Sequence, residues 1–127
     1  MQSITFFEVA SQHAKWLSER QRVVSENIAN ASTPRYRAKD VDSFAVVLNK
    51  NIGMARTHPS HIDRSDSNQN IRIIESPLDQ TVGVQVSGNT VGLTNELYKS
   101  ADIKNSYELN ALLVSKFNSM IMRVAKG

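Results

Sequence analysis

One pair of side chains in this sequence is spaced for metal binding. His58 and His61 lie three positions apart, and Asp63 and Asp66 follow them closely. Imidazole and carboxylate groups are common zinc ligands. Pro59, however, opposes a helix that would point both rings at one ion. Because nothing completes the site and the zinc-protease motif is absent, we expect no bound metal and no other cofactor.

Other catalytic arrangements are equally incomplete. The chain has no cysteine, and its serines do not occur in the Gly-x-Ser-x-Gly pattern of a nucleophile elbow. No glycine-rich phosphate-binding loop precedes a helix. His13 falls within a predicted helix, where a surface or interface role is expected. The sequence therefore predicts no enzyme, no catalytic residue and no small-molecule substrate.

Two groups of basic residues suggest contact with a polyanion. The first combines three bases with one aromatic ring: Arg35, Tyr36, Arg37 and Lys39. The second lies near the C-terminus: Lys116, Arg123 and Lys126. A small helical module that binds single-stranded nucleic acid or a membrane surface is thus one alternative. The net charge of only +3 points only weakly to nucleic acid, so we expect no nucleic-acid partner.

Length and composition limit the organisation of the chain. Its 127 residues suit a single domain, and the hydrophobic fraction of 40% predicts a thin core. No apolar run approaches the roughly 20 residues that cross a bilayer. The N-terminus lacks a basic leader and an apolar signal-peptide core, so we expect no cleaved signal peptide.

A long helix is predicted from about Phe6 to Ala31. Thr5 and Glu8 have the spacing of a capping box, and Pro34 disfavours helical geometry in the residue before it. Alternating spacings of three and four define one seam on this helix: Phe7, Ala10, Ala14, Leu17, Gln21, Val24, Ile28 and Ala31. So narrow a stripe is typical of a helix that packs against another helix.

A second long helix is predicted at the C-terminal end. Thr94 is a candidate cap, and Glu96 suits the positive end of the helix dipole. The same spacing gives a second seam: Ile103, Tyr107, Asn110, Val114, Phe117, Ile121 and Val124. Leu109, Leu113 and Met120 widen its apolar face. The two seams either pack on each other as a hairpin or form a layer that other subunits complete.

Residues 39–88 differ from both ends, because polar residues, glycine and proline interrupt only short apolar groups. Alternation at 71–73 and 82–86 predicts two short strands that pair with each other. We divide the single domain into an N-terminal helix with its following turn (1–38), a loop-rich insert (39–88) and a C-terminal helix (89–127). The fold class is mainly α, with a partly β insert.

The end of the first helix resembles the signature of the flagellar rod, hook and axial protein family. The matching residues are Asn27, Asn30, Ala31, Thr33, Pro34 and Tyr36. Arg35 stands where the family usually has glycine. Since a type II turn needs positive φ there, which is costly for arginine, we expect a type I or open turn instead.

The segment from Gly88 to Glu96 is similar to the run that opens the last helix in B-type proximal-rod members of this family. Tyr107 also matches a common position, and residues 57–62 resemble a short His-containing patch. Gly92 replaces an acidic residue of that run. These matches favour the B type over a sister rod subunit, which remains an alternative.

The resemblance implies a structural subunit of the flagellar basal-body rod, exported without processing by the flagellar type III apparatus into the periplasm. Implied partners are other copies, other rod subunits and inner-membrane ring or adaptor proteins. The expected assembly interface comprises Val24, Asn27, Ile28, Asn30, Ala31, Thr33, Pro34, Tyr36, Ile103, Tyr107, Val114, Phe117 and Ile121. Phe6 or Phe7 is the candidate export motif.

Overall fold

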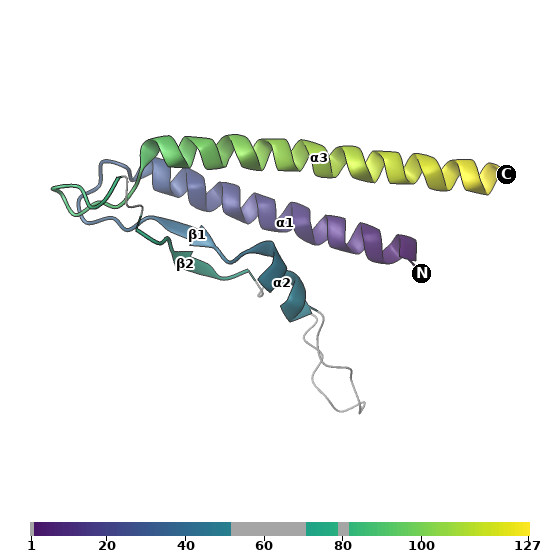
Figure 1. Ribbon diagram of the computed structural model, residues 1–127, viewed down its shortest axis with the longest axis horizontal. Coiled ribbons are helices and arrows are strands. Elements are labelled where there is room, and N and C mark those ends of the chain that lie inside the picture. The colour runs from purple at the N-terminus through teal and green to yellow at the C-terminus, as the bar shows by residue number, and fades with distance from the viewer. Residues whose placement is uncertain (1, 52–70, 79–81) are drawn as a thin grey trace, which may run out of the picture.

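Two long antiparallel helices dominate the computed structural model, which describes residues 2–51, 71–78 and 82–127 (Figure 1). The first, α1, spans Gln2–Ala29, and the last, α3, spans Leu93–Lys126. They lie side by side with both termini at the same end, where α3 projects beyond α1 (Figure 1). The predicted terminal helices are thus confirmed, and they form a hairpin within the chain.

The centre of this hairpin is a small apolar core between the predicted seams. Leu17 and Val24 of α1 are buried against Ile103 of α3, and Trp16 and Ile28 pack around them. Burying each of these aliphatic side chains contributes about 1.5–3 kcal/mol, so the seam stabilises the hairpin without any contribution from a second subunit.

Polar members of the two seams also bond across the hairpin. The Gln21 amide donates to the Ser100 hydroxyl at 3.4 Å, and the Asn110 amide donates to the Ala10 carbonyl at 3.2 Å. These bonds explain why a polar residue is tolerated on each packed face, because both amides find partners there.

A short two-stranded ribbon lies on the other side of α1. Strand β1, Lys39–Val41, pairs antiparallel with β2, Ile73–Glu75, with Asp40 opposite Ile74. The predicted pairing of 71–73 with 82–86 is therefore wrong. Backbone groups of Gln85 and Asn89 bond each other in a turn, so they are not free for a ladder, and the valines at 82, 84 and 86 are exposed.

Helix α2, Phe44–Asn51, was not predicted, because its apolar group is too short for a clear period. An aromatic contact holds it on α1. The Phe44 ring lies 4.8 Å from that of His13 and 5.9 Å from that of Trp16. The Trp16 indole N–H also donates to the Asp42 carbonyl at 2.7 Å. Together α3 and the ribbon with α2 flank α1 on two sides (Figure 1).

Both predicted helix starts require correction. Helix α1 begins at Gln2, so Thr5 lies inside it, where a T-x-x-E pattern fits the helix interior as well as a cap. Helix α3 begins at Leu93 with Gly92 in the cap position and no side-chain cap. A Cβ at Gly92 would lie 3.1 Å from the Val82 side chain, so glycine at this position allows Val82 to pack closely against the start of α3. None of the described helices is both long and apolar enough to cross a membrane.

The turn after α1 adopts the conformation that we expected arginine to avoid. Arg35 has φ 63°, and the Tyr36 amide donates to the Thr33 carbonyl at 3.3 Å, which closes a turn with positive φ at its third residue. The expected type I or open turn is thus wrong. A bond from the Arg35 amide to the Ser87 carbonyl at 3.0 Å holds the turn in place, and Gly88, with φ 80°, lies against Arg35.

Replacing Arg35 by glycine should therefore raise the free energy of unfolding by about 0.5–1 kcal/mol. Glycine removes the steric cost of positive φ, and its greater freedom in the unfolded chain offsets part of that gain. Urea denaturation measures the effect. Arg37→Gly is the control, because Arg37 has no positive φ and should lose stability. A loss in Arg35→Gly as large as in Arg37→Gly would contradict the strain argument.

Candidate functional site

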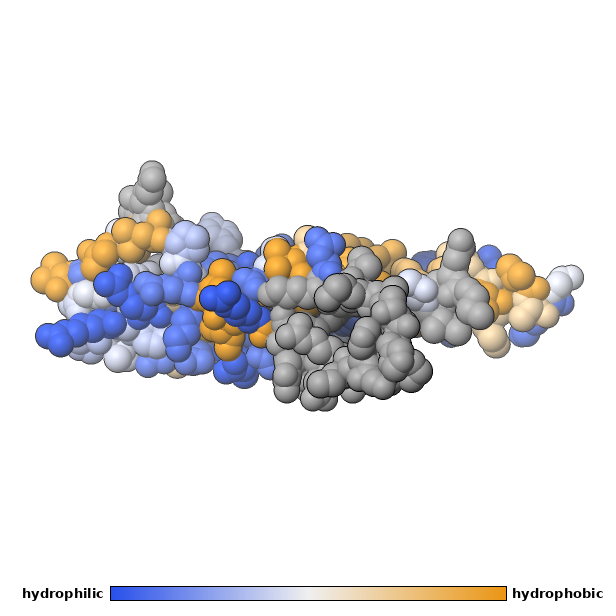
Figure 2. All heavy atoms as spheres, turned by 90° about the horizontal axis from the view of Figure 1, so that it is seen from below, coloured by the Kyte–Doolittle hydropathy of each residue, from blue (hydrophilic) through white to orange (hydrophobic). Residues whose placement is uncertain are grey.

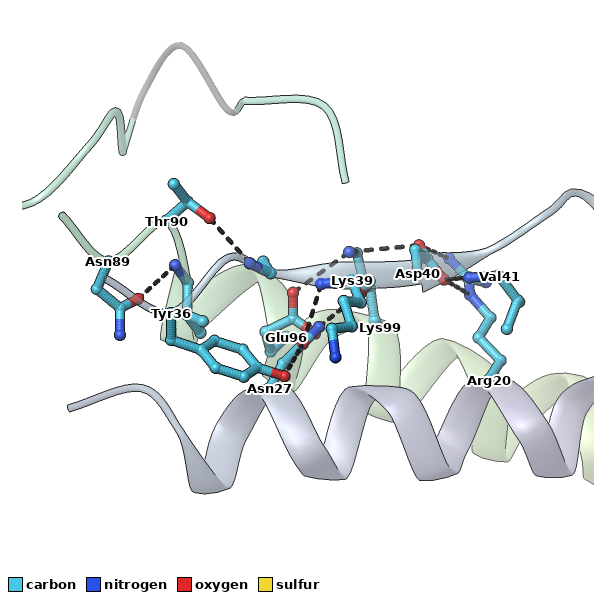
Figure 3. A network of polar contacts seen from close by, with 12 residues as sticks. Arg20, Asn27, Tyr36, Lys39, Asp40, Val41, Asn89, Thr90, Glu96 and Lys99 are labelled. Carbon is cyan, nitrogen blue, oxygen red and sulfur yellow. Dashed lines mark hydrogen bonds and ion pairs between the residues drawn. The ribbon is translucent and has the colours of Figure 1, made fainter. Parts of the chain in front are cut away.

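A polar junction forms where the end of α1, strand β1 and the start of α3 meet (Figure 3). Asn27 lies at its centre and is fully buried. Its amide group donates to the Lys39 carbonyl at 2.7 Å and to the Glu96 carboxylate at 3.1 Å. Its oxygen accepts from the Lys39 amide at 3.0 Å and the Tyr36 hydroxyl at 3.2 Å. One side chain thus joins three segments with its full hydrogen-bonding capacity.

The Tyr36 hydroxyl is suited to be a donor in this junction. Burial raises the pKa of Tyr36, and the nearby charges of Glu26 and Glu96 raise it further. The hydroxyl therefore keeps its proton at neutral pH and donates to Asn27.

Glu96 places a charge at the junction where solvent does not reach. Its residue is 2% exposed, and its carboxylate is held by Asn27 on one side and by Lys99 at 3.3 Å on the other. Its position in the first turn of α3 also places it near the positive end of the helix dipole. Lys99 and the dipole belong to α3 itself, so the bond from Asn27 is the contact that Glu96 loses if α1 and α3 separate.

Asn89 makes the second link between the two family-like segments. It is fully buried, and its amide group donates to the Asn30 carbonyl at 2.9 Å and to the Thr33 carbonyl at 2.7 Å. Its oxygen accepts from the Val91 amide at 2.7 Å. Asn89 therefore links the segment before α3 to the turn after α1, because both carbonyls belong to that turn.

An ionic cluster extends the junction along β1. Asp40 lies between Arg20, whose Nε is 3.2 Å away, and Lys99, whose Nζ is 3.4 Å away (Figure 3). Burial alone would raise the pKa of Asp40, but the Val41 amide, Arg20 and Lys99 together outweigh it and lower that pKa. The cluster links α1, β1 and α3 as Asn27 does.

The lowered pKa of Asp40 makes its contribution to stability depend on pH. In the unfolded chain Asp40 takes up a proton more readily, so this contribution is complete above its ordinary pKa of 3.8 and is lost as pH falls through the lower folded value. Asp40→Asn should lower stability at neutral pH and make the acid limb of a stability-against-pH curve shallower.

Urea denaturation over a series of pH values measures that limb. Asp102→Asn is the control, because the Asp102 side chain is 72% exposed and its oxygen lies 3.9 Å from Arg20. A limb of unchanged slope in Asp40→Asn would show that Asp40 does not contribute as described.

A groove of about 830 Å³ lies between α1 and α3. Small and apolar side chains line most of it, with a few polar ones. From α1 these are Ala14, Leu17, Ser18 and Gln21; from α3 they are Leu97, Ser100, Ala101, Ile103, Lys104, Tyr107 and Glu108. Small side chains on both helices would allow another helix to approach closely.

The predicted interface residues fall into two structural groups. Some are engaged inside the chain: Val24, Asn27 and Ile103 are buried, and Asn30 and Tyr36 are partly buried and bonded at the junction. Others keep part of their surface: Ile28, Ala31, Val114, Phe117 and Ile121 are half-buried, and Thr33, Pro34 and Tyr107 are exposed.

Phe117 belongs to an aromatic cluster near the two termini. Its ring centroid lies 4.3 Å from that of Phe6 and 5.6 Å from that of Phe7. Both residues of the candidate export motif therefore contact α3 in the folded chain, which sequence reasoning did not anticipate.

Two basic residues of the first basic group form ion pairs near the junction. In the first basic group, Arg37 lies 3.9 Å from Glu75, and Lys39 lies 3.6 Å from Glu26.

The part of the chain that the structure describes holds no group of three or more side chains arranged to bind a metal. The candidate metal pair and the patch at 57–62 lie outside the described residues.

Sequence reasoning missed Arg20, Asp40 and Lys99 as members of the junction. A signal for the first was present, because Trp16, Arg20, Val23 and Asn27 repeat at spacings of four and three and form a second stripe on α1. Since half of that stripe is polar, a search for apolar periodicity overlooks it.

Comparisons with known proteins agree with the two family-like segments. Residues 14–37 match the family described as flagella basal body rod protein. Flagellar basal body rod protein FlgB of Agrobacterium fabrum is 46% identical, over 99% of this chain and 96% of that protein. FlgB of Bacillus subtilis is 33% identical over 80% and 78% of the two chains, and FlgB of Salmonella typhimurium is 28% identical over 87% and 85%.

The fold is a helical hairpin held by a buried polar junction, with a groove between its helices, and the match at residues 14–37 assigns it to the class of flagellar basal-body rod proteins. The identity and coverage of the relatives make the assignment more specific. This chain belongs to the FlgB family of flagellar basal body rod proteins. It is a structural subunit of the flagellar basal-body rod.

Proposed function

We propose that this chain builds the proximal part of the rod through its terminal helices and transmits torque as one of several interlocked axial subunits. The observation that carries the proposal is the hairpin surface. Its groove is open, and large apolar side chains of α3 such as Leu109 and Leu113 are half exposed. Apolar surface of this kind is typical of a subunit that packs against neighbours.

The groove is the proposed seat for a helix of a neighbouring subunit. Ala14 and Ala101 permit close approach of a backbone, and Tyr107 at the rim is 53% exposed. A partly exposed tyrosine offers both an apolar ring and a hydroxyl, a combination enriched at interfaces. Of the predicted interface residues, Tyr107 is thus the one best placed for contact.

The remaining predicted interface residues have two proposed roles. Ile28, Val114, Phe117 and Ile121 would contribute their exposed parts to neighbouring subunits. The junction residues would act indirectly, because Asn27 and its partners fix the path of the turn that carries Pro34. The exposed side of that turn is then presented in one conformation to the next subunit.

The proposed export motif imposes a condition on export. Since Phe6 and Phe7 both contact Phe117 and are half-buried, an export apparatus would reach the covered faces of their rings only after the terminal ends of the helices separate. We propose that the flagellar type III apparatus handles the chain in that open form and delivers it to the periplasm without cleavage.

The proposed partners are other rod subunits, further copies of this chain and the ring or adaptor proteins at the inner membrane. Neither an enzymatic activity nor a nucleic-acid or small-molecule ligand forms part of the proposal. A sister rod type is disfavoured because the relatives given above are all named FlgB.

Mass spectrometry of purified basal bodies tests this function. Isolated from the source cells, they should contain this chain with an intact N-terminus, together with rod and inner-ring proteins. Its absence from preparations that retain the other rod proteins would overturn the proposal.

A further inference from the structure

One edge of the two-stranded ribbon is open. Strand β1 lies against α1, so β2 is the outer strand (Figure 1). The Arg72 carbonyl and the Ser76 amide bond to the chain on either side of β1. Because backbone groups alternate in direction along a strand, those of Ile73 and Glu75 point away from β1. Among the described residues, no hydrogen bond occupies these outward groups, so the edge can accept a further strand.

Residues 82–86 form a second unpaired segment, and they have the sequence of a strand. The exposed side chains of Val82, Val84 and Val86 alternate with Gly83 and Gln85. The Gln85 backbone bonds within its own turn, whereas that of Val84 makes no hydrogen bond in the part of the chain that the structure describes. Hydrophobic residues lie at the surface of this end of the molecule (Figures 1 and 2). Since valine favours a packed, pleated surface, the segment suits pairing with another strand.

We propose that residues 82–86 of one copy pair with the outer edge of β2 in a second copy and extend its ribbon to three strands. This inference rests on the proposed function, which places further copies beside this chain. Ile71 and Ile73 would then lie next to the valines, and pairs of β-branched residues across strands stabilise a sheet. The two segments whose alternation predicts paired strands are thus joined between copies and not within one chain.

The proposed contact is heterologous, because its two halves lie at different places on the chain. Each copy gives its 82–86 segment to one neighbour and receives that of another, so the contact can continue from copy to copy. Pairing of β2 with another β2 would instead close a dimer. Charge is also compatible with the proposed pairing. Residues 82–86 carry none, so neither Arg72 nor Glu75 meets a like charge.

The short length of the edge determines where the contact forms. Pro77, which has no backbone N–H, follows closely after β2 and limits the pairing to a few residues. A ladder of this length contributes little to binding by itself. We therefore expect it to form between copies that other contacts already hold side by side, and the test uses assembled rods.

Cross-linking in purified basal bodies tests the proposal. The chain contains no cysteine, so each single variant carries one thiol. Basal bodies from cells that produce both Arg72→Cys and Val84→Cys chains are treated with a short bis-maleimide. We expect mass spectrometry to find a peptide that joins the two cysteines, and such a peptide has to come from two chains. In the control, Lys15→Cys, at an exposed position on α1, replaces Arg72→Cys and should give much less product.

Two substitutions at Ile73, each added to the Arg72→Cys chain, test the backbone bonds. Proline is tolerated on an edge strand but not in the middle of a sheet. Ile73→Pro removes an N–H that points away from β1, so it should leave the bonds to β1 in place and lose most of the cross-link. Ile73→Thr also shortens the side chain but keeps the N–H, and it should retain the cross-link. Urea denaturation checks that both variants fold.

Three results would overturn the proposal. The first is a yield from Arg72→Cys and Val84→Cys no higher than that of the control, in rods that contain both chains. The second is a product that joins Arg72→Cys to a different rod protein in place of a second copy. The third is a full yield from a folded Ile73→Pro variant. All three are read in rods that contain this chain, so they leave the rod assignment intact, whereas absence of the chain from basal bodies would overturn the proposed function itself.

Discussion

Replacing Asn27 by alanine should lower the free energy of unfolding by about 3–4 kcal/mol. The change removes four hydrogen bonds at a fully buried position. It leaves the backbone groups of Lys39 without these partners and the Glu96 carboxylate with only its contact to Lys99. Buried groups that lose their partners cost far more than an average hydrogen bond contributes. For a domain of this size, such a loss approaches half of the typical stability.

Urea denaturation of Asn27→Ala and of Gln21→Ala measures this effect against a matched control. Gln21 is also a side-chain amide on α1, but it is only half-buried and bonds two serine hydroxyls. We expect its removal to cost within about 1 kcal/mol. Similar losses in the two variants would contradict the central role of Asn27.

A double-mutant cycle separates the charge from the other bonds of Asn27. In a Glu96→Gln background, the side chain at position 96 is neutral, so Asn27→Ala should cost less than it does in the natural sequence. If the cost is the same in both backgrounds, the Asn27–Glu96 bond contributes little, and the Lys39 and Tyr36 bonds carry the effect.

Phe117→Asp should abolish rod assembly and motility. The ring contacts Phe6 and Phe7, so an aspartate would place a charge against two aromatic rings at a cost of several kcal/mol. It would also place a charge on a half-buried position proposed to face neighbouring subunits. Complementation of a deletion strain, scored by swimming in soft agar and by rods in purified basal bodies, measures the outcome.

Two further variants make the Phe117 result interpretable. Asn118→Asp introduces the same side chain at the adjacent exposed position and should support swimming. Phe117→Leu keeps an apolar side chain and should assemble at reduced efficiency. Normal assembly of Phe117→Asp would contradict both the proposed interface and the importance of the aromatic cluster.

The helical hairpin was predictable because its signal is repeated. Leu17, Val24 and Ile103 lie on seams of seven or eight positions, and the core forms where the two seams meet. A repeat of that length is still recognisable when one position, such as Gln21, is polar. It does not specify whether the partner of a seam is the same chain or another, which is why both possibilities had remained open.

The insert was less predictable because its contacts are long-range. Strand β2 pairs with β1, which lies more than thirty positions earlier in the sequence. No local pattern in either segment indicates which strand it pairs with. The valines from Val82 to Val86 alternate like a strand, yet they bury no common face. Strand β1 is also bound to α1 through Asn27 and Asp40, and such long-range contacts are visible only in the folded chain.

Polar residues at the junction were recognised by their resemblance to a family and not by their physical role. Asn27 and Asn89 look like ordinary helix-end residues in the sequence, whereas the structure buries both and assigns every polar atom of Asn27 a partner. At Arg35, physical reasoning from the sequence led to the wrong turn conformation. Local preference argued against positive φ, but the bonds to Ser87 and across the turn impose it.

The antiparallel arrangement of α1 and α3 has a mechanical consequence. Because both termini lie at one end, a force that pulls them apart acts on the contacts one after another, as in unzipping. The Phe7–Phe117 contact opens first, then the Asn110 bond to Ala10, then the Gln21–Ser100 bond. The Asn27–Glu96 bond is reached last. The chain therefore resists peeling least at its termini and most at the junction, so its helix ends can separate while the turn keeps its shape.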